Sequence, residues 1–457
     1  MQVDRAHSGD AAAMLRDALG LTAAHIELHS REPLGDGAVV GFEVTEPGGA
    51  SGEVLGETLS EAPDESGGIY FVDTSGLPVA RETGWVAGGG DAGGDDAGGD
   101  AGGAAAGADN ATHGRAPAVR IWRHPEDPHL PALPAVSFPD ALAALLARAG
   151  IAVIEPPEMV AYRPGRRAVL RVVSAAGPDG AARADLWVKI VRPSRVERIV
   201  DAQAACIEAG LPVPAVRFWS PEGLVVFDAA AGTPATDVEW STEPLLDEVD
   251  ALRGRFAAVR SERPLRGVGG RLDWYASSLG GSEAAALSSR IGARLAAARP
   301  PASAVVHGDL HFGQLFLDAG GRVSGVIDVD TLGLGDPAED QAAFLGHAIA
   351  SALLTEPTRA TRVWDLADAA SERWASEGAV APLTAIHLLG HALAAGDRGD
   401  TGMRDQLLAA AGAVLDGSPP STVRPPGDPE GSDHTTRTAG RAESEDEKPL
   451  MQPLAET

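Results

Sequence analysis

The stretch HGDLHFGQLFLDAGGRVSGVIDVD, from His307 to Asp330, decides the fold and the chemistry expected of this chain. It follows an apolar run at 304–306 and contains, in order, the carboxylate of Asp309, the amide of Gln314, a turn, and a second apolar run that ends in Asp328. Phosphoryl transfer needs a carboxylate to orient the attacking hydroxyl, together with an amide oxygen and a carboxylate as Mg²⁺ ligands. The stretch therefore predicts a phosphoryl-transfer site carried by two strands and a hairpin.

Three more side chains of this stretch bear on metal binding. Asp330 follows Asp328 by two residues, so on a continuous strand both carboxylates face the same side, and Asp330 is a candidate for a second metal ion or the substrate. His307 and His311 flank Asp309 as a possible zinc pair, but Mg²⁺ prefers oxygen ligands and no third His or Cys lies nearby in the sequence. The sequence favours magnesium over zinc.

Lysine is nearly absent from the chain, which makes each lysine informative. Of 37 basic residues only Lys189 and Lys448 are lysines, and Lys448 lies in a polar stretch near the end. Lys189 lies in the β-like run 186–191. Its compact ammonium, unlike a planar guanidinium, suits the α- and β-phosphates of ATP. The other interpretation is a surface lysine on an edge strand.

The order of these groups resembles the catalytic half of the aminoglycoside phosphotransferase and choline kinase superfamily. The loop of that superfamily reads H-G-D-x-x-x-x-N and its metal strand reads I-D, at positions matching 307–314 and 327–328. The turn GLPVP at 210–214 and the motif GDP at 335–337 match it further. The resemblance covers about Phe138 to Gly417. It implies an α+β, bilobal protein-kinase-like fold with a small β-rich amino lobe and a larger helical carboxyl lobe.

The resemblance also implies a role for each residue of the site. ATP would donate its γ-phosphoryl group to a hydroxyl of a small molecule, with Asp309 orienting that hydroxyl and accepting its proton late. Asp328 would bind Mg²⁺ with Gln314 as a further ligand, and Lys189 would hold the α- and β-phosphates.

Two neighbouring regions would contact the nucleotide in such a fold. The hairpin RPGRR at 163–167 would cover the phosphates, so Arg166 is either a phosphate ligand or a solvent-facing residue. The helix after Lys189 carries Glu197 and Asp201 one turn apart, and either can pair with the lysine. Glu197 can instead cap the helix, and position within the helix favours Asp201. The stretch 224–232 matches the strand and linker that form the hinge in relatives; the other interpretation is an ordinary connection between domains.

The acceptor stays open. The superfamily usually has Asn where this chain has Gln314, whose amide oxygen lies on a longer stem. The form H-G-D-L-H-x-G-Q is similar to bacterial maltokinases and glucosamine kinases, which also have an extra amino-terminal domain. Their metal strand reads I-D-F-E, whereas this chain has IDVD at 327–330. The alternatives are an aminoglycoside, amino-sugar or sugar kinase, a maltokinase-like enzyme, or a nucleotide-binding regulatory pseudokinase.

Several side chains have a structural and a substrate-binding interpretation. Four aromatic residues either stack on sugar rings or belong to the core: Trp274, Tyr275, Trp364 and Trp374. Three acids either attract amines or cap and solvate a helix: Asp336, Glu339 and Asp340. For Asp336, a helix cap is favoured because Pro337 can open the helix that follows.

Composition and pattern divide the chain into segments. Residues 1–86 with 117–134 form a small α+β domain, 87–116 a Gly/Ala/Asp-rich disordered insertion, 135–228 the amino lobe, 229–416 the carboxyl lobe and 417–457 a disordered tail. Helices of the carboxyl lobe are expected at 245–260, 282–298, 339–354, 358–377 and 380–395.

Charge and cysteine content exclude some classes of partner. The formal net charge of −28 argues against nucleic acid and anionic membranes as main partners. A single cysteine, Cys206, excludes an intramolecular disulfide and is interpreted as a small core residue. Neither a signal peptide nor a membrane-spanning run is evident, so a cytoplasmic protein is expected.

Overall fold

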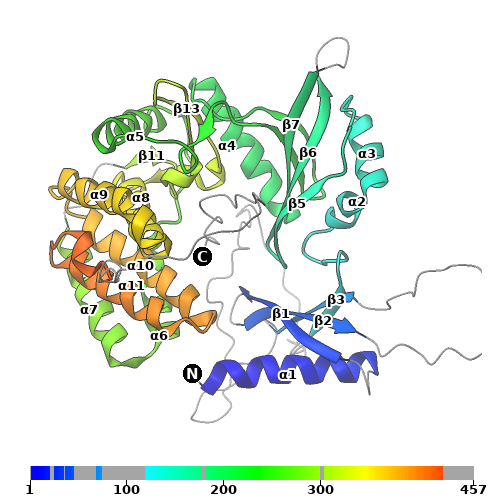
Figure 1. Ribbon diagram of the computed structural model, residues 1–457, viewed down its shortest axis with the longest axis horizontal. Helices are drawn as coiled ribbons and strands as arrows, with labels where there is room; N and C mark the ends of the chain where they lie inside the picture. Colours follow the sequence, from blue (N-terminus) through cyan, green and yellow to red (C-terminus); the bar gives the residue numbers. More distant parts are fainter. Residues whose placement is uncertain are drawn as a thin grey trace, which may run out of the picture. The chain divides into compact units, whose positions relative to one another are not determined.

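The computed structural model describes residues 2–20, 25–34, 37–45, 68–74, 119–176, 182–298 and 303–425 (Figure 1). The chain divides into two compact units. The first comprises Met1–Arg198 with Val216–Ala229, and the second comprises Ile199–Ala215 with Ala230–Thr457. The predicted insertion at 87–116 and most of the predicted tail lie outside the described residues.

The first unit begins with one helix and a four-stranded antiparallel sheet, as the alternating pattern predicts. The order along the sheet is β1-β2-β3-β4. The elements are α1 (Gln2–Leu19), β1 (His25–Leu34), β2 (Gly37–Thr45), β3 (Gly68–Asp73) and β4 (Arg120–Arg123). Side chains of β2 alternate between two faces. Val40, Phe42 and Val44 join Leu15 of α1 in one buried cluster, whereas Val39 joins a second cluster.

A five-stranded antiparallel sheet with two helices completes the first unit. Its strand order is β5-β6-β7-β9-β8. The elements are α2 (Leu133–Ser137), α3 (Pro139–Ala147), β5 (Glu158–Arg163), β6 (Arg167–Ala176), β7 (Ala182–Val191), β8 (Val216–Ser220) and β9 (Leu224–Asp228). Val188 and Ile190 of β7 belong to the same core cluster as Leu142 and Leu146 of α3. Lys189, between them on the strand, is therefore directed to the opposite face of the sheet.

Helix α4 (Val196–Glu208) crosses the division between the units, which falls after Arg198. It begins directly after the 3₁₀ turn η1 (Pro193–Arg195), so Glu197 lies in its first turn. The chain passes back to the second unit after Ala229, within the stretch expected to be the hinge.

The second unit is mostly helical, with a three-stranded sheet β10-β12-β13 and a two-stranded sheet β11-β14. Its helices are α5 (Thr242–Phe256), α6 (Leu272–Leu279), α7 (Gly281–Ala297), α8 (Ala338–Leu354), α9 (Pro357–Arg373), α10 (Val380–Asp397) and α11 (Thr401–Leu415). Its strands are β10 (Thr233–Pro234), β11 (Ala304–Val306), β12 (Leu315–Leu317), β13 (Val323–Val326) and β14 (Gly333–Gly335).

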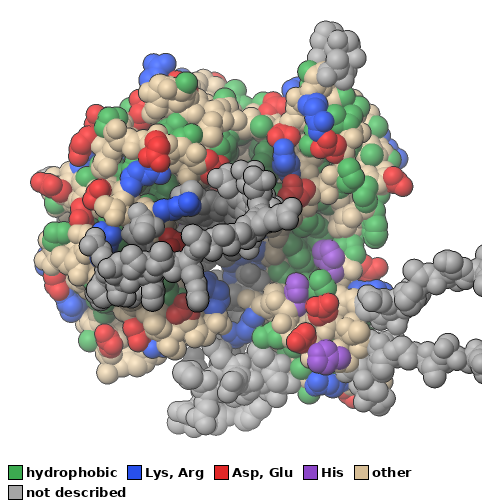
Figure 2. Space-filling model, viewed as in Figure 1, with side chains coloured by type: hydrophobic (Ala, Val, Ile, Leu, Met, Phe, Trp, Pro, Cys, Tyr) green, Lys and Arg blue, Asp and Glu red, His purple; other side chains and the backbone are tan. Residues whose placement is uncertain are grey.

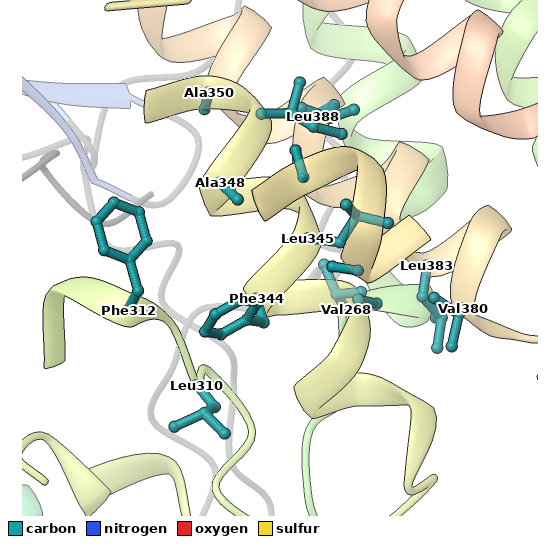
Figure 3. Packing of buried hydrophobic residues seen from close by; sticks show 14 of the residues in the cluster. Val268, Leu310, Phe312, Phe344, Leu345, Ala348, Ala350, Val380, Leu383 and Leu388 are labelled. Carbon is teal, nitrogen blue, oxygen red and sulfur yellow. The ribbon is translucent and has the colours of Figure 1, made fainter. Parts of the chain in front are cut away.

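The core of the second unit surrounds α8, whose side chains are buried along most of its length. Leu310 and Phe312, which lie within the predicted catalytic segment, belong to the same buried cluster as Phe344 of α8, and Figure 3 draws all three. Burying such side chains contributes about 1.5–3 kcal/mol each. The loop that carries Asp309 is therefore anchored by the hydrophobic core.

The α+β class with a β-rich and a helical part is confirmed, as are the five helices expected in the carboxyl lobe. Helices α6 and α11 were not expected, because α6 is short and α11 is rich in alanine, which weakens the apolar contrast. The expected start of the tail at 417 is too early. The packed chain continues through the 3₁₀ helix η5 (Pro420–Val423), where the Ser421 N–H donates to Asp368 Oδ1 at 2.9 Å. Within the described residues, no helix combines the length and apolar character needed to cross a bilayer.

Candidate active site

The buried carboxylate of Asp340 binds the backbone of the loop that carries Asp309. The backbone N–H of His307 donates to Asp340 Oδ2 at 3.0 Å, and that of Gly308 donates to Oδ1 at 2.7 Å. Gly308 has φ +86°, a conformation that only glycine adopts without strain. Asp340 was expected to cap or solvate a helix, or to attract an amine. Instead it fixes the backbone immediately before Asp309.

The same loop is tied to the strand that leads to Asp328. His307 Nε2 donates to the carbonyl of Ile327 at 3.1 Å, and Thr331 Oγ1 donates to the carbonyl of His307 at 2.6 Å. The Ile327 N–H donates to the carbonyl of Gln314 at 3.2 Å. The segments bearing Asp309 and Asp328 are thus held together by hydrogen bonds on both sides, as a joint site requires.

Asp328 has an unusual backbone conformation. Its φ of 61° and ψ of 40° place it in the left-handed region, and among the described residues it is the only non-glycine with positive φ. The 3₁₀ turn η4 (Val329–Thr331) follows directly. Strand β13 ends at Val326, before Asp328, so the prediction that Asp330 faces the same side as Asp328 along a strand is wrong. Asp330 lies within a turn instead.

Gln314 is buried and closes the 3₁₀ turn η3 (Phe312–Gln314). Its Oε1 accepts the backbone N–H of His311 at 3.2 Å, while its Nε2 is buried without a hydrogen-bond partner among the described groups. An amide oxygen has two lone pairs, so one remains for a further ligand.

Histidines from two helices converge on Asp309. His347 of α8 places Nε2 3.6 Å from Asp309 Oδ1, and its ring stacks on that of His311 at 4.2 Å between centroids. From α10, the ring of His391 meets that of His347 edge-on at 4.8 Å, and His387 lies 6.3 Å from it. No third histidine lies near Asp309 in the sequence, but His347 lies near it in space, because it comes from a helix that starts after the hairpin.

In this cluster, the surroundings favour the ionised form of the Asp309 carboxyl and the neutral form of neighbouring imidazoles. Burial opposes ionisation of Asp309, but the contact with His347 outweighs it and holds the pKa of Asp309 well below its usual range. Burial, together with the charge of His347, lowers the pKa of His311 and of His387 to about 3, and lowers the pKa of His391 as well. At neutral pH Asp309 is thus an anion, and the rings of His311 and His387 are neutral.

The predicted nucleotide-binding residues lie in more than one unit. Lys189 is buried on β7, and Arg166 lies in the turn between β5 and β6, both in the first unit. Glu197 belongs to the first unit and Asp201 to the second, and both are exposed. Asp201 forms an exposed ion pair with Arg263 at 3.2 Å. Such pairs contribute about 0–1 kcal/mol, so this contact can exchange readily.

Most of the other candidates have structural roles. Tyr275, Trp364 and Trp374 are buried in the core, and of the four aromatic candidates only Trp274 is exposed, at 45%. Asp336 Oδ1 accepts the N–H of Ala338 at 2.9 Å, as expected of a residue that caps α8. Cys206 is fully buried, and burial raises its pKa to about 12, in agreement with a core residue.

Comparisons with known proteins show which family the chain belongs to. Similar solved structures include macrolide 2'-phosphotransferase MphH from Brachybacterium faecium, with 20% identity over 64% of this chain and 99% of that one, at a TM-score of 0.39. A second is aminoglycoside phosphotransferase APH(3'')-Id from Streptomyces rimosus, with 19% identity over 60% of this chain and 95% of that one, at a TM-score of 0.32. A thermostable mutant of APH(4)-Ia has 13% identity over 60% and 97%, at a TM-score of 0.44.

No curated protein matches the chain. A sequence profile of the phosphotransferase enzyme family, in contrast, matches residues 123–383, which is more than half of the chain and includes both Asp309 and Asp328. The chain therefore belongs to the phosphotransferase enzyme family.

Proposed function

We propose that this small-molecule phosphotransferase moves the γ-phosphoryl group of ATP to a hydroxyl group of a sugar, an amino sugar or an aminoglycoside. The observation that carries the proposal is the joint anchoring of Asp309 and Asp328. The Ile327 carbonyl accepts from His307, so the residue before Asp328 is bonded to the segment that begins the Asp309 loop. Phosphoryl transfer requires two such carboxylates in a fixed mutual position.

Asp309 is suited to orienting the acceptor. Its low pKa keeps it ionised at neutral pH, so one oxygen can accept a hydrogen bond from the attacking hydroxyl. A carboxylate of low basicity takes the proton only late, when the bond to phosphorus is largely formed. Asp309 therefore acts more by positioning the hydroxyl than by removing its proton in advance.

Mg²⁺ and ATP are implied by the family, and the donor atoms present fit them. Asp328 offers a carboxylate and Gln314 an amide oxygen with a spare lone pair, both of which are oxygen ligands that Mg²⁺ prefers. When bound, Mg²⁺ would neutralise charge on the phosphates. Asp330 is a weaker candidate because it lies in the 3₁₀ turn after Asp328.

On the first unit, Lys189 would bind the α- and β-phosphates of the nucleotide. It is 7% exposed and is directed away from the core cluster of its own sheet. Glu197 and Asp201 remain the acids proposed to pair with it, and Arg166 is proposed to contact phosphate. The exposed contact between Asp201 and Arg263 would have to open for Asp201 to take this role.

The test is Mg-ATP turnover across a panel of free sugars, amino sugars, maltose and aminoglycosides. Asp309→Asn should lower turnover about 10²- to 10⁴-fold. Asp318→Asn is the matched control, because Asp318 accepts the N–H groups of Gly320 and Arg322 in the exposed hairpin and should leave turnover unchanged.

ATP binding is measured separately for both variants by calorimetry. Binding of ATP without any phosphorylated product, from the panel or from a metabolite extract, would contradict the proposal and favour a nucleotide-binding pseudokinase. A product formed equally well by Asp309→Asn would contradict the role of Asp309 alone.

A further inference from the structure

Asp309, His311 and His347 bring three potential metal ligands together. One carboxylate oxygen and two imidazole nitrogens lie within 4.8 Å of one another, and the Asp309 Oδ1 to His347 Nε2 distance is 3.6 Å. Ligand atoms of a tetrahedral site with bonds of about 2.0–2.2 Å lie roughly 3.4 Å apart. One pair already has nearly this separation, and the widest pair has to approach by up to about 1.4 Å.

The rings can make this adjustment by rotation. His311 and His347 stack with an angle of 18° between their planes, so their in-plane lone pairs lie in nearly parallel planes and must turn toward one point. The terminal torsion of histidine is broad, so such a turn costs little. Next to the pair, His391 packs edge-on against His347, and the buried His387 Nε2 has no hydrogen-bond partner among the described groups.

We propose that Asp309, His311 and His347 form a binding site for a borderline divalent cation such as Zn²⁺. Imidazole nitrogens select this class of ion, whereas the oxygen donors of Asp328 and Gln314 suit Mg²⁺. Three protein ligands leave a fourth tetrahedral position open to water or a substrate hydroxyl. Residues of the Mg²⁺ site are not used, so the two ions bind to different atoms.

Occupancy by Zn²⁺ has a consequence that rests on the proposed function. The ion would take the Asp309 oxygen that orients the acceptor hydroxyl, so Zn²⁺ should inhibit phosphoryl transfer while ATP still binds. Metal binding itself does not depend on that function and is measured without any acceptor.

The direct test titrates Zn²⁺ into the chelator-treated full chain against a chromogenic zinc chelator. The wild type should bind one ion that His347→Phe and His311→Phe lose, since phenylalanine keeps the stacked ring and removes its nitrogens. Loss of an outer-shell group alone weakens a metal site about 10- to 100-fold, so loss of a ligand should weaken it at least as much. His391→Phe is the matched control within the cluster and should retain the site. Equal affinity in all the proteins, or equal loss in all three variants, would overturn the proposal.

A measurement on the wild type alone covers the case in which a variant fails to fold. Co²⁺ bound at this site should give the intense visible absorption of tetrahedral coordination, and Zn²⁺ should displace it. Absence of binding, or the weak spectrum of an octahedral ion, would overturn the site. A Zn²⁺-loaded protein with full phosphotransferase activity would overturn the inhibitory consequence and leave the binding result standing.

Discussion

Asp127 accepts a hydrogen bond from the N–H of Gly165 at 2.7 Å and so holds the turn of the hairpin proposed to cover the ATP phosphates. The other bonds to this buried carboxylate come from the Tyr162 hydroxyl at 3.0 Å and the His129 N–H at 2.9 Å. On the other side of the turn, Arg192 Nε donates to the Gly165 carbonyl at 2.8 Å. The segment after β4 thereby fixes a loop of the five-stranded sheet, and both belong to the first unit.

Asp127→Ala should therefore weaken nucleotide binding. The substitution leaves the Gly165 N–H and the Tyr162 hydroxyl without their acceptor, and a hydrogen bond to a charged group contributes about 1.5–3 kcal/mol. We expect the KM for ATP to rise about tenfold or more, with a smaller change in kcat. Steady-state kinetics measure both. Glu126→Ala changes the exposed neighbouring acid and should have no effect; an unchanged KM in Asp127→Ala would show that the loop does not need this support.

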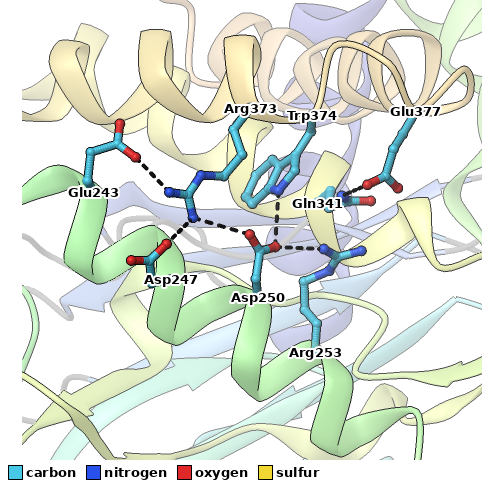
Figure 4. Close-up of polar contacts among 8 residues, drawn as sticks. All are labelled: Glu243, Asp247, Asp250, Arg253, Gln341, Arg373, Trp374 and Glu377. Carbon is cyan, nitrogen blue, oxygen red and sulfur yellow. Dashed lines mark hydrogen bonds and ion pairs between the residues drawn. The ribbon is translucent and has the colours of Figure 1, made fainter.

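A second prediction concerns the contact between α5 and α9 (Figure 4). Asp250 accepts from Trp374 Nε1 at 3.1 Å and from Arg253 Nη1 at 2.9 Å, both on Oδ1, and from Arg373 on Oδ2. Trp374 is buried, so Asp250→Ala leaves its indole N–H unpaired. We expect a loss of about 1–3 kcal/mol in the free energy of unfolding, measured by denaturant titration.

The same cluster supplies the control for that experiment. Arg373 also bonds to Asp247 at 2.8 Å and to Glu243 at 2.6 Å, but both acids are mostly exposed. Figure 2 shows acidic and basic side chains side by side over this part of the surface. Asp247→Ala should cost less than about 1 kcal/mol, as for other exposed pairs. An equal loss of unfolding free energy in Asp250→Ala and Asp247→Ala would show that the hydrogen bond to the buried Trp374 indole adds no stability.

In this chain, the features that the sequence predicted correctly are those that depend on residues close together along the chain. Asp309, Gln314 and Asp328 lie on one segment, and the strand, loop and hairpin of that segment are what the sequence predicted correctly. His347 and His391 lie in apolar helices, where a single histidine has the pattern of a core residue. Their approach to Asp309 depends on how α8 and α10 pack, and a local sequence pattern does not predict this packing. The error at Asp330 has a local cause, because β13 ends at Val326 and the left-handed Asp328 leads into a 3₁₀ turn.

Stability should also depend on pH through Glu339. Burial raises the pKa of this carboxyl to about 7, although the Val268 N–H donates to its Oε2 at 3.2 Å and opposes the shift. Because the folded pKa lies above the unfolded one, protonation stabilises the fold. This contribution is complete below the unfolded value of 4.5 and is lost as the pH rises through about 7.

Glu339→Gln should remove that dependence, since glutamine keeps an oxygen acceptor and cannot ionise. The free energy of unfolding, measured by denaturant titration at steps between pH 5 and pH 8 (about the range of this titration), should fall less steeply in the variant. At about 1.4 kcal/mol per unit of pKa, the difference amounts to no more than roughly 3 kcal/mol. Glu283→Gln, in the exposed first turn of α7, is the control. Parallel curves for wild type and Glu339→Gln would contradict the raised pKa.

Because Asp328 has a left-handed backbone, substitutions at this position should change stability and activity differently. A Cβ in this conformation costs about 1–2 kcal/mol, which glycine avoids. Asp328→Gly and Asp328→Ala both lack the carboxylate proposed to bind Mg²⁺, so both should lose turnover. They differ mainly in the Cβ, so Asp328→Gly should be more stable than Asp328→Ala by about 1 kcal/mol in denaturant titration. Asp328→Asn, which tolerates the conformation, should remain folded and inactive. Equal stability of the glycine and alanine variants would mean that Asp328 is not strained, and turnover in any of the three would remove Asp328 from the site.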